Sequence, residues 1–289
     1  NNSTTTFTGN TLANNSASTN GGIYFIAQYG SLDFSNNTLA GNSASQHYGG
    51  IELRTYNFAP RLTNNSFIGN TAAGSFGGVY LFSPHGGYAV LNNNLFVGNT
   101  ATSYSDLYGD VNLGASSNNM ISHASASGGL FNGGLTDGTN GNVIGVDWTD
   151  VVATTVAGGS TVPLVTDNGG PTPTVALIYG SPAIDAGSNA NAVDASGAPL
   201  LHDQRGAGFG RIFAGNVDIG AFEYFNSAPD AVNDVASEVN LFEDDGATDI
   251  SAAILANDSD ADGDPITITA IDASSITKGV LVLTGGVVT

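Results

Sequence analysis

The sequence contains no cysteine. Neither a disulfide framework nor a cysteine-bound metal can therefore hold this chain together. Its four histidines have no second histidine at the spacing of a metal-ligand pair, which argues against a zinc site. The rigidity of the fold must come from packing and hydrogen bonds.

Basic residues and long apolar runs are also scarce. Five lysines and arginines stand against 25 acidic residues, for a formal net charge of −20, which argues against nucleic acids and anionic membrane surfaces as partners. No apolar run reaches the ~18 to 20 residues of a membrane-spanning helix. Twelve of the 25 acidic residues lie between Asp230 and Asp272, so we expect a separate acidic domain at the C-terminal end.

What the sequence does contain is a repeated phrase. "NTLANNSA" at 10–17 returns as "NTLAGNSA" at 37–44, "NSFIGNTA" at 65–72 and "NLFVGNTA" at 94–101. The phrase recurs after 27, 28 and 29 residues. A repeat of this length is typical of a solenoid, in which each coil stacks on the next. The abundance of Asn, Gly, Ser and Thr excludes helical repeats, so the pattern predicts a parallel β-helix with coils ~4.8 Å apart.

The repeated asparagines predict hydrogen-bonded ladders, because a side-chain amide can both donate to and accept from its copy in the next coil. We expect these asparagines also to take the left-handed turn conformation. One ladder comprises Asn10, Asn37, Asn65 and Asn94, and the other comprises Asn15, Asn42, Asn70 and Asn99. The inward positions are assigned to Leu12, Leu39, Phe67 and Phe96, with Ala17, Ala44, Ala72 and Ala101 as small fillers. Glycines at 21–22, 49–50 and 77–78 are expected where a side chain would obstruct a bend.

The stretch "NSFIGNTAAGSFGGVY" at 65–80 resembles the repeats of right-handed parallel β-helix surface proteins, including polymorphic outer-membrane proteins of bacteria. This resemblance implies an all-β fold, with the β-helix over residues 1–125. The resemblance does not indicate an activity, since the same fold occurs in adhesins, lyases, glycosidases and inert stalks.

Residues 126–225 read as last coils and a loop-rich cap that covers the open end of the β-helix. "DNGGPTPTVALIYGSPAIDAGSNA" at 167–190 and "DQRGAGFGRIFAGNVDIGAFEY" at 203–224 resemble the choice-of-anchor Q region of bacterial surface proteins. Two interpretations of their charged residues stay open. Asp185 and Asp203 could form an acid/base pair beside Arg205, or Arg205 could pair with Asp218 or Glu223 to pin the cap. The structural interpretation is favoured, because ion-pair networks are often structural.

Residues 226–289 resemble part of a cadherin-like or immunoglobulin-like tandem repeat, which implies a partial β-sandwich with strands at 266–271 and 279–284. The phrase "DSDADGD" is similar to a calcium loop, because alternating carboxylates repel one another unless a cation lies between them. The predicted Ca²⁺ ligands are Asp258, Asp260, Asp262, Asp264, Asn233 and Asp234, with Glu243, Asp244 and Asp245 as further candidates. The alternative is a solvated acidic turn.

These observations predict a non-catalytic structural or adhesive protein, extracellular or at a bacterial cell surface. Its expected partners are further copies of itself, joined head to tail into a fibre by β-strand addition, or a surface polysaccharide or cell receptor. The alternative is a polysaccharide-acting lyase or glycosidase. Its best candidate residues are Glu52 and Arg54 with Asp33, although Tyr24 and Tyr80 at the position of Glu52 in adjacent coils suggest an ordinary exterior stack.

Overall fold

The computed structural model describes residues 4–123, 134–213, 215–234, 247–262, 264–272 and 280–289. The chain forms two compact units, Asn1–Tyr224 and Phe225–Thr289, and each is described by itself. Among the described residues, no helix has the length and apolar character needed to cross a membrane.

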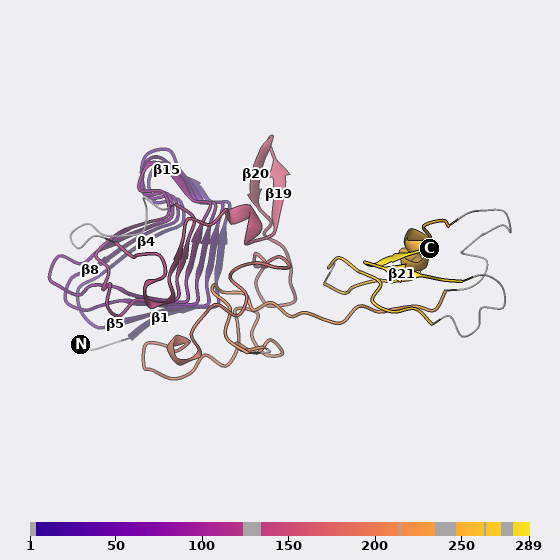
Figure 1. Ribbon diagram of the computed structural model, residues 1–289. Helices are drawn as coiled ribbons and strands as arrows, with labels where there is room; N and C mark the ends of the chain where they lie inside the picture. Colours follow the sequence, from indigo (N-terminus) through magenta and orange to yellow (C-terminus); the bar gives the residue numbers. More distant parts are fainter. Residues whose placement is uncertain (1–3, 124–133, 214, 235–246, 263, 273–279) are drawn as a thin grey trace. The chain divides into compact units, whose positions relative to one another are not determined.

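The first unit is built on a parallel β-solenoid whose coils run through four sheets in turn (Figure 1). Sheet A contains β1 (Thr4–Thr8), β5 (Ser31–Ser35), β9 (Arg61–Thr63) and β13 (Val90–Asn92). Sheet B contains β2 (Thr11–Ala13), β6 (Thr38–Ala40), β10 (Ser66–Ile68), β14 (Leu95–Val97), β17 (Met120–Ile121) and β18 (Val143–Ile144). Sheet C contains β3 (Ser16–Ala17), β7 (Ser43–Ala44), β11 (Thr71–Ser75) and β15 (Thr100–Ser103). Sheet D contains β4 (Ile23–Ala27), β8 (Ile51–Thr55), β12 (Val79–Phe82) and β16 (Leu107–Gly109).

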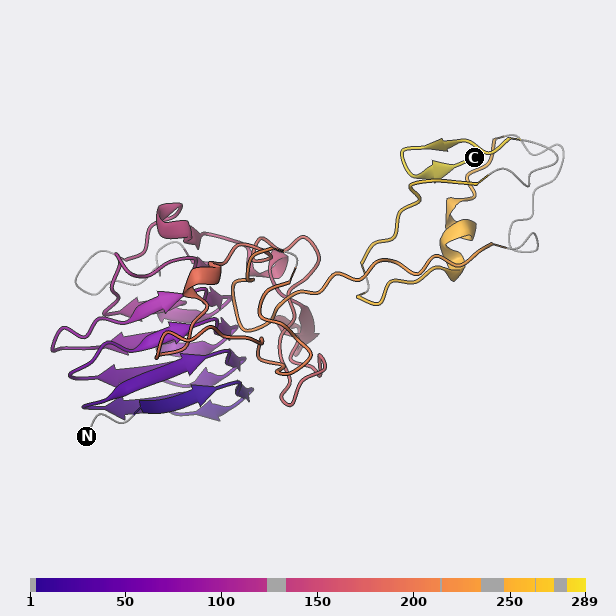
Figure 2. The same cartoon turned by 90° about the horizontal axis from the view of Figure 1, so that it is seen from below.

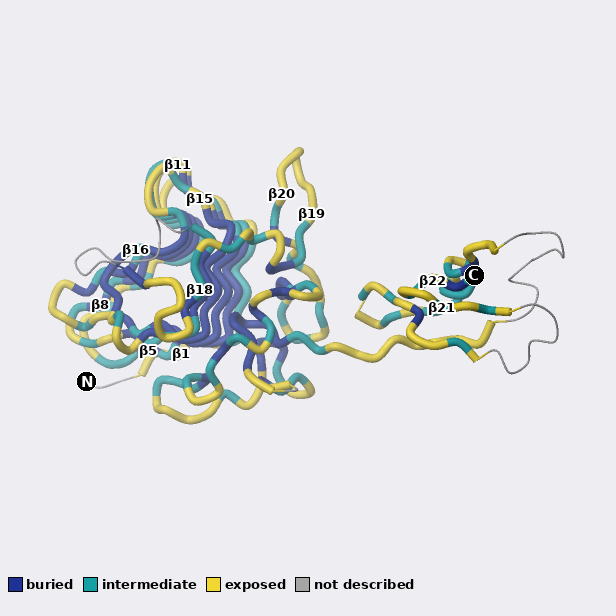
Figure 3. Tube along the Cα trace, viewed as in Figure 1, coloured by how far each residue is buried: buried dark blue, intermediate teal, exposed yellow. Residues whose placement is uncertain are grey.

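The register of these strands is the one that the repeat predicts. Leu12 pairs with Leu39, Leu39 with Phe67 and Phe67 with Phe96. Figure 2 shows the strands stacked coil upon coil, and Figure 3 shows buried chain gathered in their interior. Leu39, Phe67 and Phe96 are fully buried, and the rings of Phe67 and Phe96 stack with centroids 5.2 Å apart. The predicted β-helix with its inward row is therefore confirmed as a parallel β-solenoid.

Both asparagine ladders form. In the first, Asn37 Nδ2 donates to Asn65 Oδ1 at 3.0 Å, and Asn65 Nδ2 donates to Asn94 Oδ1 at 2.9 Å. The ladder then continues beyond the predicted members to Asn119 and Asn142. The second ladder runs through Asn15, Asn42, Asn70 and Asn99 and ends on the carboxylate of Asp106.

The turn conformation belongs to the residue before each ladder asparagine, so our expectation that one asparagine does both was wrong. Asn36 has φ 51° and precedes Asn37, while Gly41 has φ 64° and precedes Asn42. A residue at the turn points its side chain out of the coil, whereas a ladder residue must point along the stack. The two tasks therefore fall to adjacent positions, which explains the paired "NN" of the sequence.

The paired glycines allow neighbouring coils to approach closely. A Cβ added to Gly49 would lie 2.4 Å from the carbonyl oxygen of Thr71 and 2.5 Å from that of Gly77. A Cβ on Gly50 would lie 2.4 Å from the carbonyl oxygen of Gly78. Any side chain at these positions would force the coils apart, as the sequence led us to expect.

Residues 146–224, which we call the flank segment, lie along the side of the solenoid and not across its end as we predicted (Figure 2). The segment contains η3 (Trp148–Asp150), the antiparallel hairpin of β19 (Thr154–Ala157) and β20 (Ser160–Pro163), and η4 (Asn189–Asn191). Its apolar residues, including Val151, Leu177 and Ile219, pack on outward residues of sheet B such as Ile68 and Val97. Apolar side chains point outward from sheet B, and the flank segment shields them from water along the sheet.

The turn asparagines attach the flank segment coil by coil. Asn36 Nδ2 donates to His202 O at 2.9 Å, and Asn64 Nδ2 donates to Asp218 O at 3.2 Å. Asn93 and Asn118 donate in the same way to Ser188 O and Ala186 O. Leu135, just before η2 (Thr139–Gly141), joins the core of the solenoid.

The second unit is small and irregular. It contains α1 (Ser251–Ile254), η5 (Leu255–Asn257) and the hairpin of β21 (Leu283–Thr284) with β22 (Val287–Val288). Ile250, Ile268 and Val288 form its buried cluster. The predicted β-sandwich is not shown: residues 266–271 form no strand, and of the described residues 280–284 only 283–284 lie in one. The buried cluster of the described residues is small for a core between two packed sheets.

We predict that Asn70→Leu destabilises the solenoid by about 1 to 3 kcal/mol, because it leaves buried polar groups without a partner. Asn42 N and Asn42 Nδ2 both donate to Asn70 Oδ1, at 3.1 Å and 2.9 Å, and Leu39 O accepts from Asn70 Nδ2. Chemical unfolding of the purified chain measures the loss.

The matched control is Asn15→Leu at the solvent-exposed start of the same ladder, where the loss should be clearly smaller. Equal losses at the two positions would contradict a buried, cooperative ladder. Asn64 is unsuitable as a control, because it is fully buried and bonded to the flank segment.

Candidate functional site

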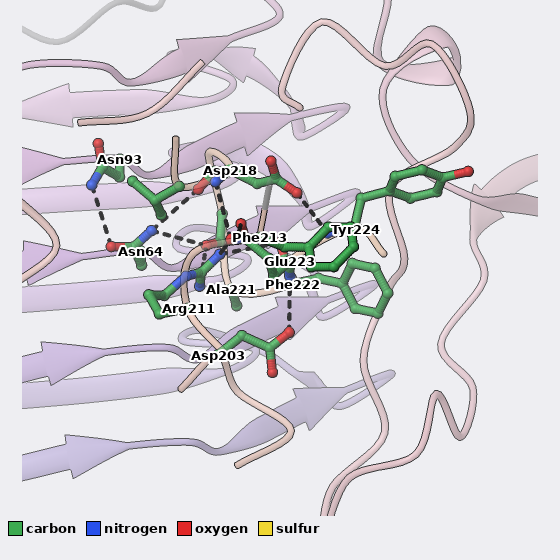
Figure 4. A network of polar contacts seen from close by, with 12 residues as sticks. Asn64, Asn93, Asp203, Arg211, Phe213, Asp218, Ala221, Phe222, Glu223 and Tyr224 are labelled. Atoms are coloured by element: carbon green, nitrogen blue, oxygen red, sulfur yellow. Dashed lines mark hydrogen bonds and ion pairs between the residues drawn. The ribbon is translucent and has the colours of Figure 1, made fainter. Parts of the chain in front are cut away.

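Five charged residues of the flank segment, Asp203, Arg205, Arg211, Asp218 and Glu223, meet in one buried network, of which Figure 4 shows Asp203, Arg211, Asp218 and Glu223. Arg205 forms an ion pair with Asp203 at 2.7 Å, and Arg211 forms one with Glu223, also at 2.7 Å. All four side chains are almost completely buried. Because burying a charge is costly unless it is paired and hydrogen-bonded, the geometry of each group decides its role.

Arg205 is held on every side. Its Nε and Nη2 both donate to Asp203 Oδ2, at 2.9 Å and 2.7 Å, and Nη2 also donates to Glu223 O at 2.5 Å. Its guanidinium carbon lies 4.0 Å from the ring centroid of Phe209 and 3.9 Å from that of Phe222. This sandwich uses the planar faces of the guanidinium as well as its edge.

Arg211 and Glu223 join the flank segment to the solenoid. Arg211 Nη1 donates to Asn36 Oδ1 at 3.3 Å and to Gly220 O at 3.1 Å. Glu223 Oε2 accepts from Arg211 Nη2 and from Asp218 N, while Oε1 accepts from Phe213 N. The network therefore fixes the backbone at Phe213, Asp218 and Gly220 against a turn of the solenoid.

The sequence analysis identified the residues of this network but not their partners. Asp218 accepts from Tyr224 N and Asp185 N, and Arg205 pairs with Asp203 rather than with Asp218 or Glu223. Arg211, which takes Glu223, was missed. The sequence could have indicated it. The chain has only five basic residues, and Arg211 lies within an apolar, glycine-rich phrase. A buried arginine there must be paired.

The geometry gives little support to an acid/base pair of Asp185 and Asp203. Asp203 is 3% exposed, and its oxygens accept from the Arg205 side chain, Arg205 N and Glu223 N. Asp185 has φ 54°, and its carboxylate accepts from Asn216 N. Both carboxylates hold backbone in place.

Three carboxylates share two arginines in this network, so it carries excess negative charge. Burial raises the pKa of Glu223 to about 7, against the opposing effect of Arg211 and with a further increase from Asp218. Burial likewise raises the pKa of Asp218 to about 6, against its hydrogen bonds from Tyr224 N and Asp185 N. The network is therefore sensitive to pH near neutrality.

The aspartates proposed to bind calcium bond to backbone in this structure. Asp260 Oδ1 accepts from Asp262 N at 2.8 Å and Asp264 N at 3.1 Å. Asp258 Oδ1 accepts from Val232 N, and Asp262 Oδ2 accepts from Ser227 N. The other predicted ligands, Asn233 and Asp234, directly follow Val232 and are exposed.

In this arrangement the carboxylates of Asp258, Asp260 and Asp262 accept from backbone amides. Across the part of the chain that the structure describes, no three His, Cys, Asp or Glu side chains gather as a metal-binding group. Glu243, Asp244 and Asp245, like Gly263, lie outside the described residues. The calcium site stays a prediction from the sequence.

The candidates for polysaccharide chemistry divide between two faces. Glu52 and Arg54 lie on β8 in sheet D, where Arg54 Nη2 contacts Glu52 Oε1 at 2.5 Å. Asp33 lies on β5 in sheet A and pairs in register with Arg61, so it does not join them. As the sequence predicts, Tyr24 and Tyr80 flank Glu52 on the adjacent strands.

No protein-family model, no curated protein and no solved structure matches this chain. The resemblances that the sequence analysis noted therefore rest on the quoted phrases alone.

We predict that the free energy of unfolding decreases as the pH rises from about 5 to about 8, because carboxyl groups of the flank network lose their protons. A carboxyl group whose pKa is raised in the folded state binds more protons there than in the unfolded state, so its contribution is present at low pH and is lost as pH rises through the folded value. For Glu223 that window runs from its ordinary value of 4.5 to about 7. Thermal unfolding as a function of pH measures the slope.

The control is Glu223→Gln, which cannot ionise and should flatten the slope over this range. His123 acts in the same direction, since its hydrogen bond with Asp106 raises the pKa of the imidazole, and Glu223→Gln leaves that contribution in place. An identical slope in the wild type and the variant would show that Glu223 titrates as it does in solvent.

We predict that millimolar Ca²⁺ raises the unfolding temperature of the second unit alone, since an ion that binds only the folded state stabilises it by mass action. Calorimetry with and without a chelator measures the shift. Asp260→Asn should abolish it, while its amide oxygen can still accept the backbone hydrogen bonds of the turn. The absence of any shift in the wild type would leave a solvated acidic turn.

Proposed function

We propose that this chain belongs to a non-catalytic structural or adhesive protein at the extracellular surface of a bacterium. The observation that carries the proposal is the use of the flank carboxylates. Asp203 and Glu223 are buried, and each accepts from an arginine and from backbone amides. These carboxylates hold the flank segment in place and are not free to react. This use favours a rigid scaffold over a reaction centre.

The finer assignment rests on sequence resemblance. It comprises right-handed coils like those of polymorphic outer-membrane proteins, a choice-of-anchor Q-like region and a partial cadherin-like or Ig-like module. Each of these belongs to large proteins displayed outside bacterial cells, where a scaffold without cysteine gains its stability from stacked coils. The acidic C-terminal unit would serve as a calcium-stiffened connector.

A polysaccharide-acting enzyme is the second candidate, and one observation favours it. The Glu52 side chain is 4% exposed, its partner Arg54 is 31% exposed, and both lie among tyrosines on one face. A buried carboxylate beside a partly exposed guanidinium could act on a sugar. However, glycoside hydrolysis normally needs a second carboxyl group opposite the first, and Asp33 lies on another sheet.

Head-to-tail assembly by β-strand addition is the proposed mode of self-association, and the ladders restrict it. Among the described residues, the oxygens Asn10 Oδ1 and Asn15 Oδ1 accept no hydrogen bond, so the first coil offers acceptors. At the other end of the second ladder, Asp106 takes the last donors and itself bonds to Ser122 and His123. In a head-to-tail contact of this kind, the partner copy would bring donors to Asn10 Oδ1 and Asn15 Oδ1.

The two function classes separate in a pair of assays on one preparation. We expect beads coated with the chain to be retained on bacterial or host cells, and no release of reducing ends from neutral or acidic polysaccharides. Glu52→Gln and Arg54→Ala serve as the catalytic controls. Turnover by the wild type that either change abolishes would overturn the structural proposal in favour of the enzyme.

Electron microscopy of the same material at high concentration addresses assembly. Fibres whose growth is blocked by Asn10→Leu with Asn15→Leu would support strand addition at the first coil, because both free acceptors are then removed. A stable monomer by light scattering would end the fibre hypothesis and leave the adhesive role to the bead assay.

A further inference from the structure

One outer face of the solenoid is rich in aromatic residues. It comprises the outward row of sheet D and the corner that precedes it, and we call it the tyrosine face. Its members are Tyr24, Tyr48, Phe76, Tyr80, Tyr104 and Tyr108. Along sheet D the in-register row is Tyr24, Glu52, Tyr80 and Tyr108. Successive coils thus present similar groups at a regular spacing along the solenoid axis.

The corner residues of this face are held in a strained conformation. Tyr48, Phe76 and Tyr104 have φ values of 65°, 68° and 61°, and the left-handed region costs a residue with a side chain roughly 1 to 2 kcal/mol. In the first coil the same corner holds Asn20, with φ 57°, a residue that tolerates this conformation. Aromatic rings are therefore present where the backbone alone favours asparagine or glycine.

Ring stacking offsets part of this strain. The centroids of Tyr48 and Phe76 lie 5.1 Å apart, and those of Phe76 and Tyr104 lie 5.4 Å apart, with nearly parallel planes. Such pairs contribute about 0.5 to 1.5 kcal/mol. Strained residues that persist in a fold gather at functional sites, and three in successive coils point to a use for the rings.

An ion pair of Glu52 and Arg54 lies within the tyrosine face. Arg54 Nε and Nη2 contact Glu52 Oε1 at 2.6 Å and 2.5 Å, and Glu52 is 3% exposed as a residue. Tyr80 pairs in register with Glu52 on the adjacent strand, and the ring centroids of Tyr48 and Tyr80 lie 5.3 Å apart. The pair presents donors to a ligand while its charges cancel.

The face is close to electrically neutral, whereas the chain as a whole is not. Burial raises the pKa values of Tyr48, Tyr80 and Tyr108, that of Tyr108 to about 12, so the hydroxyls stay protonated. Asp106 and Asp110, the acidic residues next to Tyr104 and Tyr108 in the sequence, are both buried, and Asp110 accepts from Ser83 N. The formal charge of −20 repels polyanions, so a neutral ligand suits this face better than an acidic one.

We propose that the tyrosine face binds a neutral, linear polysaccharide. The inference rests on the proposed adhesive function and names its ligand class. Tyr24 is 52% exposed and Tyr104 is 42% exposed, so their ring surfaces can pack on sugar rings, while tyrosine hydroxyls and Arg54 hydrogen-bond to sugar hydroxyls. A row of similar groups repeated by coil suits a chain of repeated sugars better than a compact protein partner.

Native affinity electrophoresis tests the proposal directly, because the acidic chain migrates well without detergent. The gels contain hydroxyethyl cellulose, starch, glucomannan or dextran as neutral probes, and polygalacturonate as the acidic one. We expect retardation by at least one neutral polymer, little by polygalacturonate, and at least a tenfold loss of affinity in a Tyr24→Ala, Tyr104→Ala variant. Tyr24→Ala alone should also weaken binding, and it leaves the ring stack of the corner intact.

The matched control is Tyr179→Ala, which removes a 60% exposed tyrosine of the flank segment and should leave retardation unchanged. Thermal unfolding verifies that each variant is folded. Failure of every neutral polymer to retard the wild type, or equal retardation of the wild type and the folded double variant, would overturn the inference. The bead assay keeps this separate from the proposed function: if the double variant still adheres to cells like the wild type, the adhesive role stands and its ligand is not bound here.

Discussion

The whole solenoid depends on the saturation of one side-chain amide between coils. Asn65 Oδ1 accepts from both Asn37 N and Asn37 Nδ2, while Asn65 Nδ2 donates to Asn94 Oδ1 and to Phe34 O. All the hydrogen-bonding capacity of the amide is used in a fully buried place, where an unmade bond is costly. An aspartate side chain has no N–H donor, and a leucine side chain has neither a donor nor an acceptor. Each ladder position within the stack therefore requires asparagine.

The second amide ladder, from Asn15 to Asn99, has a direction, and its last acceptor shows why. Each asparagine amide donates to the next coil in the C-terminal direction. The last asparagine therefore needs an acceptor that has no N–H group of its own to satisfy. Asp106 supplies it: the carboxylate is fully buried, accepts from Asn99 N and Nδ2, and bonds to His123. A carboxylate can finish a ladder but cannot extend it. The chemistry of one residue thus separates a finished end of the second ladder from an open one.

The repeat allowed the coil length, the register and the inward row to be predicted, because each follows from spacing alone. The place of the flank segment did not follow, although a signal was present. In "SFIGN" two and in "LFVGN" three adjacent apolar residues lie in a three-residue strand, so Phe67 and Phe96 point inward while Ile68 and Val97 point outward. An apolar outer row requires a lateral cover. The partners of Arg205 and Arg211 could not be predicted, since residue types say what must pair but not which backbone turns bring them together.

The same rule of alternation separates the two outer faces that matter here. Outward side chains of sheet B are largely aliphatic, with Thr38 and Ser66 bonded to the flank segment, and the flank segment buries Ile68 and Val97 completely. Outward side chains of sheet D form two rows, one of Tyr24, Glu52, Tyr80 and Tyr108 and one of Ile26, Arg54 and Phe82. The rings of the tyrosines are apolar and their hydroxyls are not, and Tyr24 remains more than half exposed. An aliphatic row can be satisfied only by other apolar groups, whereas a tyrosine row is stable in water and still favours a ligand with both apolar faces and hydroxyls. One solenoid therefore carries a permanently covered face and a face suited to reversible binding, and the difference lies in which residues alternate with the core.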